Sequence, residues 1–186
     1  MDKEAEVNHT QFEAYTNALR QRLEADERTL ALVALGSMAE QSRWDEWSDH
    51  DFWLVTTAGI QEAFLSDLSW LPNHERISLP LRQADRYYTV LYDDGHIAEF
   101  AVFASDELSQ AKTNAYHVLF DKGGITPQVE QVYQATQDSA TTYADIDAAF
   151  ELGNFVPHLW VGVTRYWRGE VISSYKYVTQ FALVSA

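Results

Sequence analysis

The stretch Ala34-Leu35-Gly36-Ser37, followed after eleven residues by Asp49-His50-Asp51-Phe52, decides how the rest of this sequence is interpreted. The apolar run 30–35 predicts a buried strand, and Gly36 lets the backbone turn where that strand ends. Ser37 is expected to open the next helix, where its hydroxyl and the free backbone amides can hold phosphate oxygens. The first half of the stretch therefore predicts a phosphate-binding turn.

The second half places two carboxylates on one side of a strand. Asp49 and Asp51 are two residues apart, so in an extended segment both side chains point to the same face. The aromatic and β-branched run 52–56 has the composition of a strand that can hold them rigidly. Two carboxylates suit Mg²⁺, which keeps several waters and is usually completed by substrate phosphates. Gly-Ser and Asp-x-Asp are also common in solvated turns, and their order between two apolar strands is what favours a phosphate site.

A third acidic side chain is expected near this pair, because two metal ions that bridge a nucleotide phosphate need more than two protein carboxylates. Glu99 is the favoured candidate, since the run 97–103 is otherwise apolar and a carboxylate there is costly to bury unpaired. Asp93 and Asp94 are rivals by residue type. Because they precede Gly95, they are better explained as the hairpin turn that leads into the Glu99 strand.

Gly36-Ser37, Asp49-x-Asp51 and Glu99 together resemble the motifs of the DNA-polymerase-β-like nucleotidyltransferase superfamily. Within it, the sequence most resembles bacterial aminoglycoside adenylyltransferases of the streptomycin type. Three segments carry this narrower resemblance: residues 45–52 are similar to "D-x-W-S-D-x-D", residues 118–122 to "L-L-D-K", and residues 160–176 to the helix that enters the C-terminal domain. Several relatives carry an arginine where this chain has Met38, and Arg43 lies too far along to replace it.

The resemblance implies an α+β (α/β) nucleotidyltransferase fold, with a mixed β-sheet flanked by helices and followed by a helical C-terminal segment. It implies an adenylyltransferase of the antibiotic-resistance type, which uses magnesium to transfer AMP from ATP to a hydroxyl of an aminoglycoside-like molecule. Asp49, Asp51 and Glu99 would be the catalytic residues and metal ligands. Gly36 and Ser37 would bind the nucleotide.

The segment after residue 154 carries the remaining site predictions. If residues 154–176 form one helix, Arg165, Arg168 and Lys176 lie close to one stripe of it. A basic stripe that faced the Gly-Ser turn would neutralise the triphosphate, and the resemblance suggests a lysine of the second domain in that role. Lys176 and Arg168 are therefore predicted to bind the nucleotide, with a solvated helix face as the alternative. Glu170 is predicted to contact a substrate ammonium group.

The sequence predicts two parts. The resemblance implies a nucleotidyltransferase domain at 1–125, and the composition shift after Pro127 predicts a helical C-terminal segment at 126–186. Because the family usually continues into a longer helical domain, the second part is expected to be either a small extension or a truncated domain. Further elements are expected as helices at 10–28 and 61–70 and as strands at 77–81, 87–92, 97–104 and 116–120.

The composition narrows the class of protein. With 186 residues, of which 46% are hydrophobic, the chain can bury a core, and the absence of cysteine excludes disulfides and thiolate metal sites. No apolar stretch is long enough to cross a bilayer, so we expect a cytoplasmic protein with no membrane partner. The six histidines lack the paired helical spacing of zinc enzymes, and His50 is expected to point away from its two aspartate neighbours.

The formal net charge of −15 would repel a nucleic-acid backbone, which counts against a polymerase or an RNA-tailing enzyme. An acidic cleft would attract a polycationic small molecule such as an aminoglycoside, although many proteins are acidic for solubility alone. Two alternatives stay open. One is a nucleotidyltransferase of another acceptor, such as a lincosamide or a protein side chain, and the other is a non-catalytic nucleotide-binding module.

Overall fold

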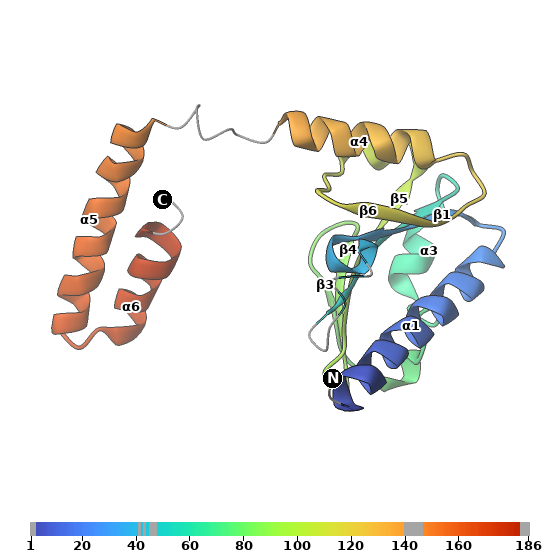
Figure 1. Cartoon of the computed structure of the whole chain (residues 1–186), viewed down its shortest axis with the longest axis horizontal. Coiled ribbons are helices and arrows are strands. Elements are labelled where there is room, and N and C mark those ends of the chain that lie inside the picture. Colours follow the sequence, from blue (N-terminus) through green and yellow to red (C-terminus); the bar gives the residue numbers. More distant parts are fainter. Residues whose placement is uncertain (1–2, 41, 43, 45–47, 140–146, 183–186) are drawn as a thin grey trace. The chain divides into compact units, whose positions relative to one another are not determined.

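The computed structural model describes residues 3–40, 42, 44, 48–139 and 147–182 (Figure 1). Its contacts divide the chain into two compact units, Met1–Ser139 and Ala140–Ala186. The first unit holds a β-sheet with helices packed on it, and the second is helical. Arg43 and residues 45–47 of the predicted acidic motif lie outside the described residues.

The first unit is built on one six-stranded sheet with the strand order β3-β4-β5-β2-β1-β6. Strands β2 and β5 are parallel, whereas every other pair of neighbours is antiparallel, so the sheet is mixed. The strands are β1 (Thr29–Leu35), β2 (His50–Thr56), β3 (Ile77–Arg82), β4 (Tyr87–Tyr92), β5 (Ile97–Ala104) and β6 (Tyr116–Asp121). The predicted fold class, a mixed α+β sheet flanked by helices and followed by a helical segment, is confirmed.

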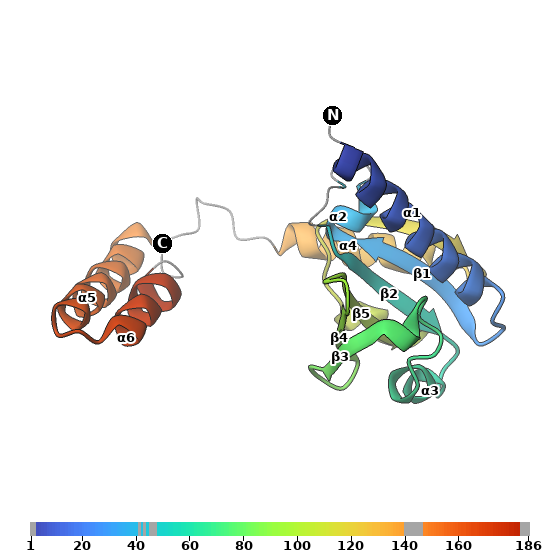
Figure 2. The same ribbon diagram turned by 90° about the horizontal axis from the view of Figure 1, so that it is seen from below.

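Helices α1 (Lys3–Glu24) and α3 (Gln61–Ser66) cover one face of this sheet. Leu19 and Leu23 of α1 are fully buried against the sheet, in the same apolar cluster as Phe64 of α3. Figure 2 shows α1 running alongside β1, and α3 contacts β5. The apolar residues of α1 recur at helical spacing and form one stripe. This stripe packs on the sheet.

The opposite face is covered at one end by α4 (Thr126–Asp138) and the short 3-10 helix η3 (Ser105–Gln110). Val129 and Leu108 belong to the apolar cluster that contains Phe103 of β5 on this face. Period-two alternation brings Asp51 and Glu99 to the same face, four residues before Val55 and Phe103 on their strands. Both acidic side chains are only half-buried there. We refer to this part, which α4 and η3 leave uncovered, as the open end of the face.

The second unit consists of α5 (Ala148–Trp167), α6 (Val171–Lys176) and a π-helical turn, η5 (Tyr177–Ala182). Asp147 caps α5 by accepting hydrogen bonds from two backbone amides, and Gly169, with φ at +80°, reverses the chain after it. Gly162 allows close packing of the hairpin, since a Cβ there would lie 2.6 Å from Val178 Cγ2. Residues 154–176 therefore do not form a single helix.

The expected strands are present with small changes of bounds, and the helix predicted at 61–70 is shorter because α3 ends at Ser66. The sequence placed the boundary between the two parts at residue 125, whereas α4 packs on the sheet and belongs to the first unit. None of the helices that the structure describes is long and apolar enough to cross a membrane.

Candidate active site

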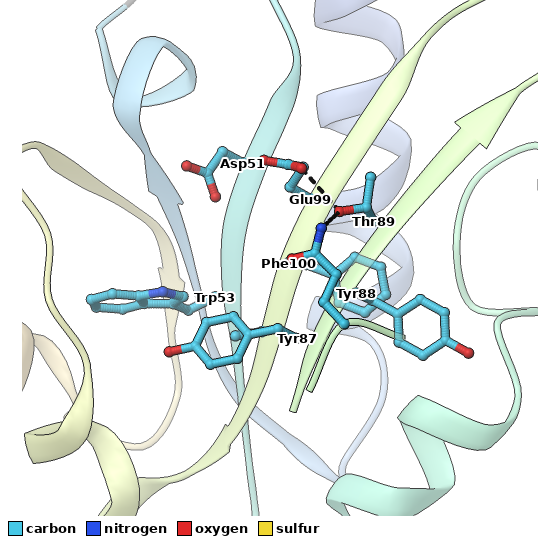
Figure 3. A pocket seen from close by; sticks show the side chains of 9 residues that line it. Asp51, Trp53, Tyr87, Tyr88, Thr89, Glu99 and Phe100 are labelled. Carbon is cyan, nitrogen blue, oxygen red and sulfur yellow. Dashed lines mark hydrogen bonds between the residues drawn. The ribbon is translucent and has the colours of Figure 1, made fainter. Parts of the chain in front are cut away.

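Asp51 and Glu99 are direct cross-strand partners in the parallel pair β2 and β5. Their side chains lie on the same face of the sheet, and Figure 3 shows the Glu99 carboxylate between Asp51 and Thr89. Residues that are far apart in the sequence are thus fixed as neighbours by backbone hydrogen bonding. This arrangement makes a carboxylate pair on rigid elements.

The Gly-Ser turn lies beside this pair. Strands β1 and β2 are antiparallel with Ala34 opposite Phe52, so the end of β1 meets the beginning of β2. Gly36 has φ at +50°, and a Cβ placed on it would lie 3.6 Å from Asp51 Oδ2. The single-turn helix α2 (Gly36–Ala39) begins at this point, with Ser37 half-buried. The structure therefore brings the predicted phosphate turn and the predicted metal ligand together.

The electrostatics of Asp51 set it apart from an ordinary surface carboxylate. Burial raises the pKa of its carboxyl group to about 6, and the negative charges of Asp49 and Glu99 add to the effect. Asp49 lies just before β2 and is also half-buried. Three acidic residues thus act on one another at this place.

Within the described residues of the first unit, no lysine or arginine forms an ion pair with Asp49, Asp51 or Glu99. The same residues contain no ready-made group of three or more His, Cys, Asp or Glu side chains that could hold a metal ion. A pair of neighbouring carboxylates with uncompensated charge fits Mg²⁺, which takes one or two protein carboxylates and completes its shell with water and phosphate oxygens. The donor set is thus compatible with the ion without forming an all-protein cage.

Glu99 is held by a short chain of hydrogen bonds from β4 and the turn before it. Thr89 Oγ1 donates to Glu99 Oε1 at 2.9 Å, and Gln83 Nε2 donates to Thr89 Oγ1 at 2.7 Å (Figure 3). Thr89 is also the backbone partner of Glu99 across β4 and β5. The carboxylate therefore has a defined orientation.

A pocket of about 100 Å³ opens at the carboxylate pair. Its aromatic side chains include Trp53, which is almost fully buried, and Tyr87, which is 41% exposed. Tyr87 is held edge-on against Phe103, with the ring centroids 6.2 Å apart. A ligand in this pocket would meet carboxylates at one end and aromatic rings beyond them.

His50 points to the other face, as the sequence predicts. It is 1% exposed and stacks on Phe12 of α1 with the ring centroids 3.8 Å apart. Its Nε2 lies 3.0 Å from Thr16 Oγ1, and its Nδ1 lies 2.7 Å from His96 Nε2. Burial lowers the pKa of the His50 imidazole well below its ordinary value, and the neighbouring His96 adds to the effect. His50 anchors the start of β2 and is not part of the carboxylate group.

The rival acidic residues lie in the turn between β4 and β5, as expected from their sequence. The Arg76 guanidinium lies 2.7 Å from Asp93 Oδ1 and 3.2 Å from Asp94 Oδ2, and Gly95 adopts φ of +86°. These two carboxylates are therefore exposed partners of an arginine.

The remaining predicted residues lie in the second unit. Arg165 Nη1 lies 2.9 Å from Glu170 Oε2, Arg168 follows the last turn of α5, and Lys176 Nζ lies 5.6 Å from the centroid of the Phe181 ring. The prediction that Arg165, Arg168 and Lys176 share one stripe of a single helix is wrong, because the chain reverses at Gly169. Their roles in nucleotide or substrate binding stay predictions.

Neither Thr89 nor Gln83 was predicted from the sequence, although the hairpin pattern indicates the position of Thr89. Once residues 93–95 are taken as the turn of a hairpin, counting back along both strands pairs Leu91 with Ile97 and Thr89 with Glu99. Gln83 lies beyond the end of β3, where no periodic pattern indicates the direction of a side chain.

A scan of protein-family models finds no match to this sequence, and a search of the curated proteins finds none either. Among solved structures, the chain is similar to an aminoglycoside 6-adenyltransferase from Bacillus subtilis, with 16% sequence identity and a TM-score of 0.42. The match covers 94% of this chain and 64% of that one, so the chain spans just under two thirds of the length of that protein.

Proposed function

We propose that this protein is a magnesium-dependent adenylyltransferase that transfers AMP from ATP to a hydroxyl of an aminoglycoside-like small molecule. The observation that carries the proposal is the in-register pair Asp51 and Glu99 beside the Gly36 turn, unneutralised by any lysine or arginine that the structure describes. The resemblance of Gly36-Ser37, Asp49-x-Asp51 and Glu99 to the polymerase-β-like motifs supports the same activity.

In the proposed reaction, Asp49 and Asp51 would hold magnesium, and Glu99 would either complete the metal site or take the proton of the attacking hydroxyl. Bound magnesium would offset charge on the phosphates and lower the pKa of that hydroxyl. The acceptor oxygen forms a bond to the α-phosphorus, the bond from that phosphorus to the bridging oxygen breaks, and pyrophosphate leaves. The parallel strands position the reacting groups, because they hold the Asp51 and Glu99 carboxylates fixed relative to the Gly-Ser turn.

Nucleotide binding is assigned to Gly36 and Ser37, whose turn lies against Asp51. Lys176 and Arg168 of the second unit are proposed to bind phosphate oxygens, and Glu170 to contact an ammonium group of the acceptor. The acceptor is proposed to be cationic because the net charge is −15 and the carboxylates at the pocket are unneutralised within the described residues. The same charge disfavours a nucleic-acid substrate. The cytoplasm, which supplies ATP and magnesium, is the proposed location.

The test is an AMP-transfer assay with ATP labelled on the α-phosphate, magnesium and a panel of aminoglycosides, followed by pyrophosphate release. Wild-type protein is expected to label at least one aminoglycoside, and Asp51→Asn to lose most of this activity because it removes a metal ligand. Asp93→Asn is the matched control, since Asp93 is also acidic but pairs with Arg76 away from the pocket. Equal activity of Asp51→Asn and wild type would rule out the metal-ligand assignment.

The panel also separates the alternatives. If lincosamides or a protein are labelled and no aminoglycoside is, the protein transfers AMP as proposed, but to a different class of acceptor. Binding of ATP without pyrophosphate release for any acceptor would favour a non-catalytic nucleotide-binding module.

A further inference from the structure

We propose that Thr89, supported by Gln83, is a positioning residue for Glu99. It occupies one oxygen of the Glu99 carboxylate and leaves the other free for the metal. The inference rests on the role of Glu99 in the proposed function. Neither Thr89 nor Gln83 touches the reacting atoms in this scheme, so both act through Glu99.

The direction of the two hydrogen bonds follows from the chemistry of the groups. An ionised carboxylate can only accept, so the Thr89 hydroxyl must use its single proton on Glu99 Oε1, 2.9 Å away. Its lone pairs are then available, and the Gln83 amide donates to them at 2.7 Å. The series of hydrogen bonds from Gln83 through Thr89 therefore holds Glu99 Oε1 and opposes rotation of the carboxylate.

The supporting residues are themselves fixed by the sheet. Thr89 is paired in register with Glu99 on one side and with Leu81 of β3 on the other. The Gln83 backbone amide donates to the Tyr87 carbonyl at 2.9 Å, which closes the turn between β3 and β4. The backbone of both donor residues is thus hydrogen-bonded, and this fixes the positions from which they orient Glu99.

Glu99 Oε2 accepts no hydrogen bond from any residue that the structure describes. Since Glu99 lies between Asp51 and Thr89 in Figure 3, holding one oxygen from the Thr89 side leaves the rest of the carboxylate for the Asp51 side. Outer partners of this kind commonly change metal affinity or activity by about 10–100-fold when they are removed. An ordinary cross-strand hydrogen bond, by contrast, would contribute to stability alone.

The experiment compares Thr89→Val, which keeps the β-branched shape and removes the hydroxyl, with Thr89→Ser, which keeps the hydroxyl. Thr89→Val is expected to lower kcat by about 10–100-fold with little change in KM for ATP, and Thr89→Ser to recover most of the loss. Gln83→Leu removes the outer hydrogen bond of this series, from a residue outside the strands. It should also lower kcat, but by a smaller factor than Thr89→Val. Thr57→Val is the matched control, because the Thr57 hydroxyl bonds the Arg28 carbonyl and takes no part in the pocket.

A second readout uses Mn²⁺ alone and needs no turnover. Thr89→Val is expected to weaken Mn²⁺ binding by about tenfold, while Thr89→Ser and Thr57→Val bind as wild type does. If wild-type protein transfers AMP and Thr89→Val does so at the same rate, or if Thr89→Ser recovers nothing, the positioning role is wrong and the proposed function stands. If wild-type protein modifies no acceptor, the proposed function fails, and Mn²⁺ affinities alone decide whether Thr89 positions Glu99.

Discussion

Asp51 and Glu99 stand opposite each other on parallel strands, with the backbone register holding two like charges side by side at the open end of a sheet face. A fold selected for stability alone has no reason to keep this arrangement, because half-buried like charges repel each other. A cation in the site during function would offset this repulsion between the two carboxylates. The relationship therefore links the stability of the sheet to the proposed chemistry and leads to predictions on both.

Asp51→Asn should make the protein more stable at pH 8. The pKa of Asp51 in the native state is about 6 against an ordinary 3.8, so the native state binds this proton more tightly than the unfolded state. Wild-type stability therefore falls as the pH rises from about 4 to about 6, and the loss persists at pH 8. The variant should melt a few degrees higher at pH 8, since about 1 kcal/mol corresponds to about 2–4 °C for a chain of this size, and the difference should shrink at pH 4.5. Thermal melts followed by circular dichroism at both pH values measure it, and a gain that is equal at both would contradict the assignment.

Metal binding should be lost on acidification. Asp51 must be ionised to bind a cation, so Mn²⁺ affinity should be flat around pH 8 and fall by up to about tenfold per pH unit below pH 6. Calorimetric titration with Mn²⁺ alone avoids the ionisation of nucleotide phosphates. Asp51→Asn supplies the baseline, and a wild-type curve no steeper than that of the variant would argue against Asp51 as a ligand.

Gly36→Ala should weaken ATP binding as well as stability. The residue has φ at +50°, where an L side chain costs about 1–2 kcal/mol, and the new methyl group would lie 3.6 Å from Asp51 Oδ2, in space assigned to phosphate. Gly95→Ala is the matched control, because Gly95 has φ at +86° and open space around it. Both variants should lose similar stability in chemical denaturation, and only Gly36→Ala should lose affinity for magnesium-ATP in calorimetry. Equal affinities would remove Gly36 from the nucleotide site.

His50→Ala should destabilise the first unit by about 3 kcal/mol, because it leaves a cavity next to Phe12 and removes the partner of Thr16 and His96. Urea denaturation measures the loss. His74→Ala serves as control, since the His74 side chain is exposed beside Glu75. If His50→Ala proves as stable as this control, β2 is not anchored through the imidazole.

The strands were predictable because each depends on local pattern, whereas the expectation that Glu99 joins Gly36 and Asp51 came from metal chemistry and from the family resemblance, since the pairing of β2 with β5 is not local. An apolar run gives a strand, a glycine gives the turn after it, and period-two alternation fixes which face a carboxylate shares. The orientation of His50 away from Asp51 followed from the same alternation. Local rules were enough where the chain is extended and buried.

The errors arose where packing or a single residue overrides periodicity. Helix α4 was assigned to the second part, yet Asp121 at the end of β6 accepts hydrogen bonds from the Ile125 and Thr126 amides and ties α4 to the sheet. Residues 154–176 are compatible with one helix throughout, but Gly169 enters the left-handed region and divides them. The hydrogen bonds of Gln83 to Thr89 and of Thr89 to Glu99 depend on side-chain directions that no spacing rule encodes.

The parallel pairing of β2 with β5 also affects how the protein folds. Two parallel neighbours cannot be joined by a tight turn, and here the whole segment 57–96, with α3, β3 and β4, must cross over before Asp51 meets Glu99. Contacts between such distant residues are slow to form, because the loop-closure entropy has to be overcome first. A nascent or partly folded chain therefore carries Glu99 apart from Asp49 and Asp51, and the proposed affinity for divalent ions should develop fully only when β2 and β5 pair.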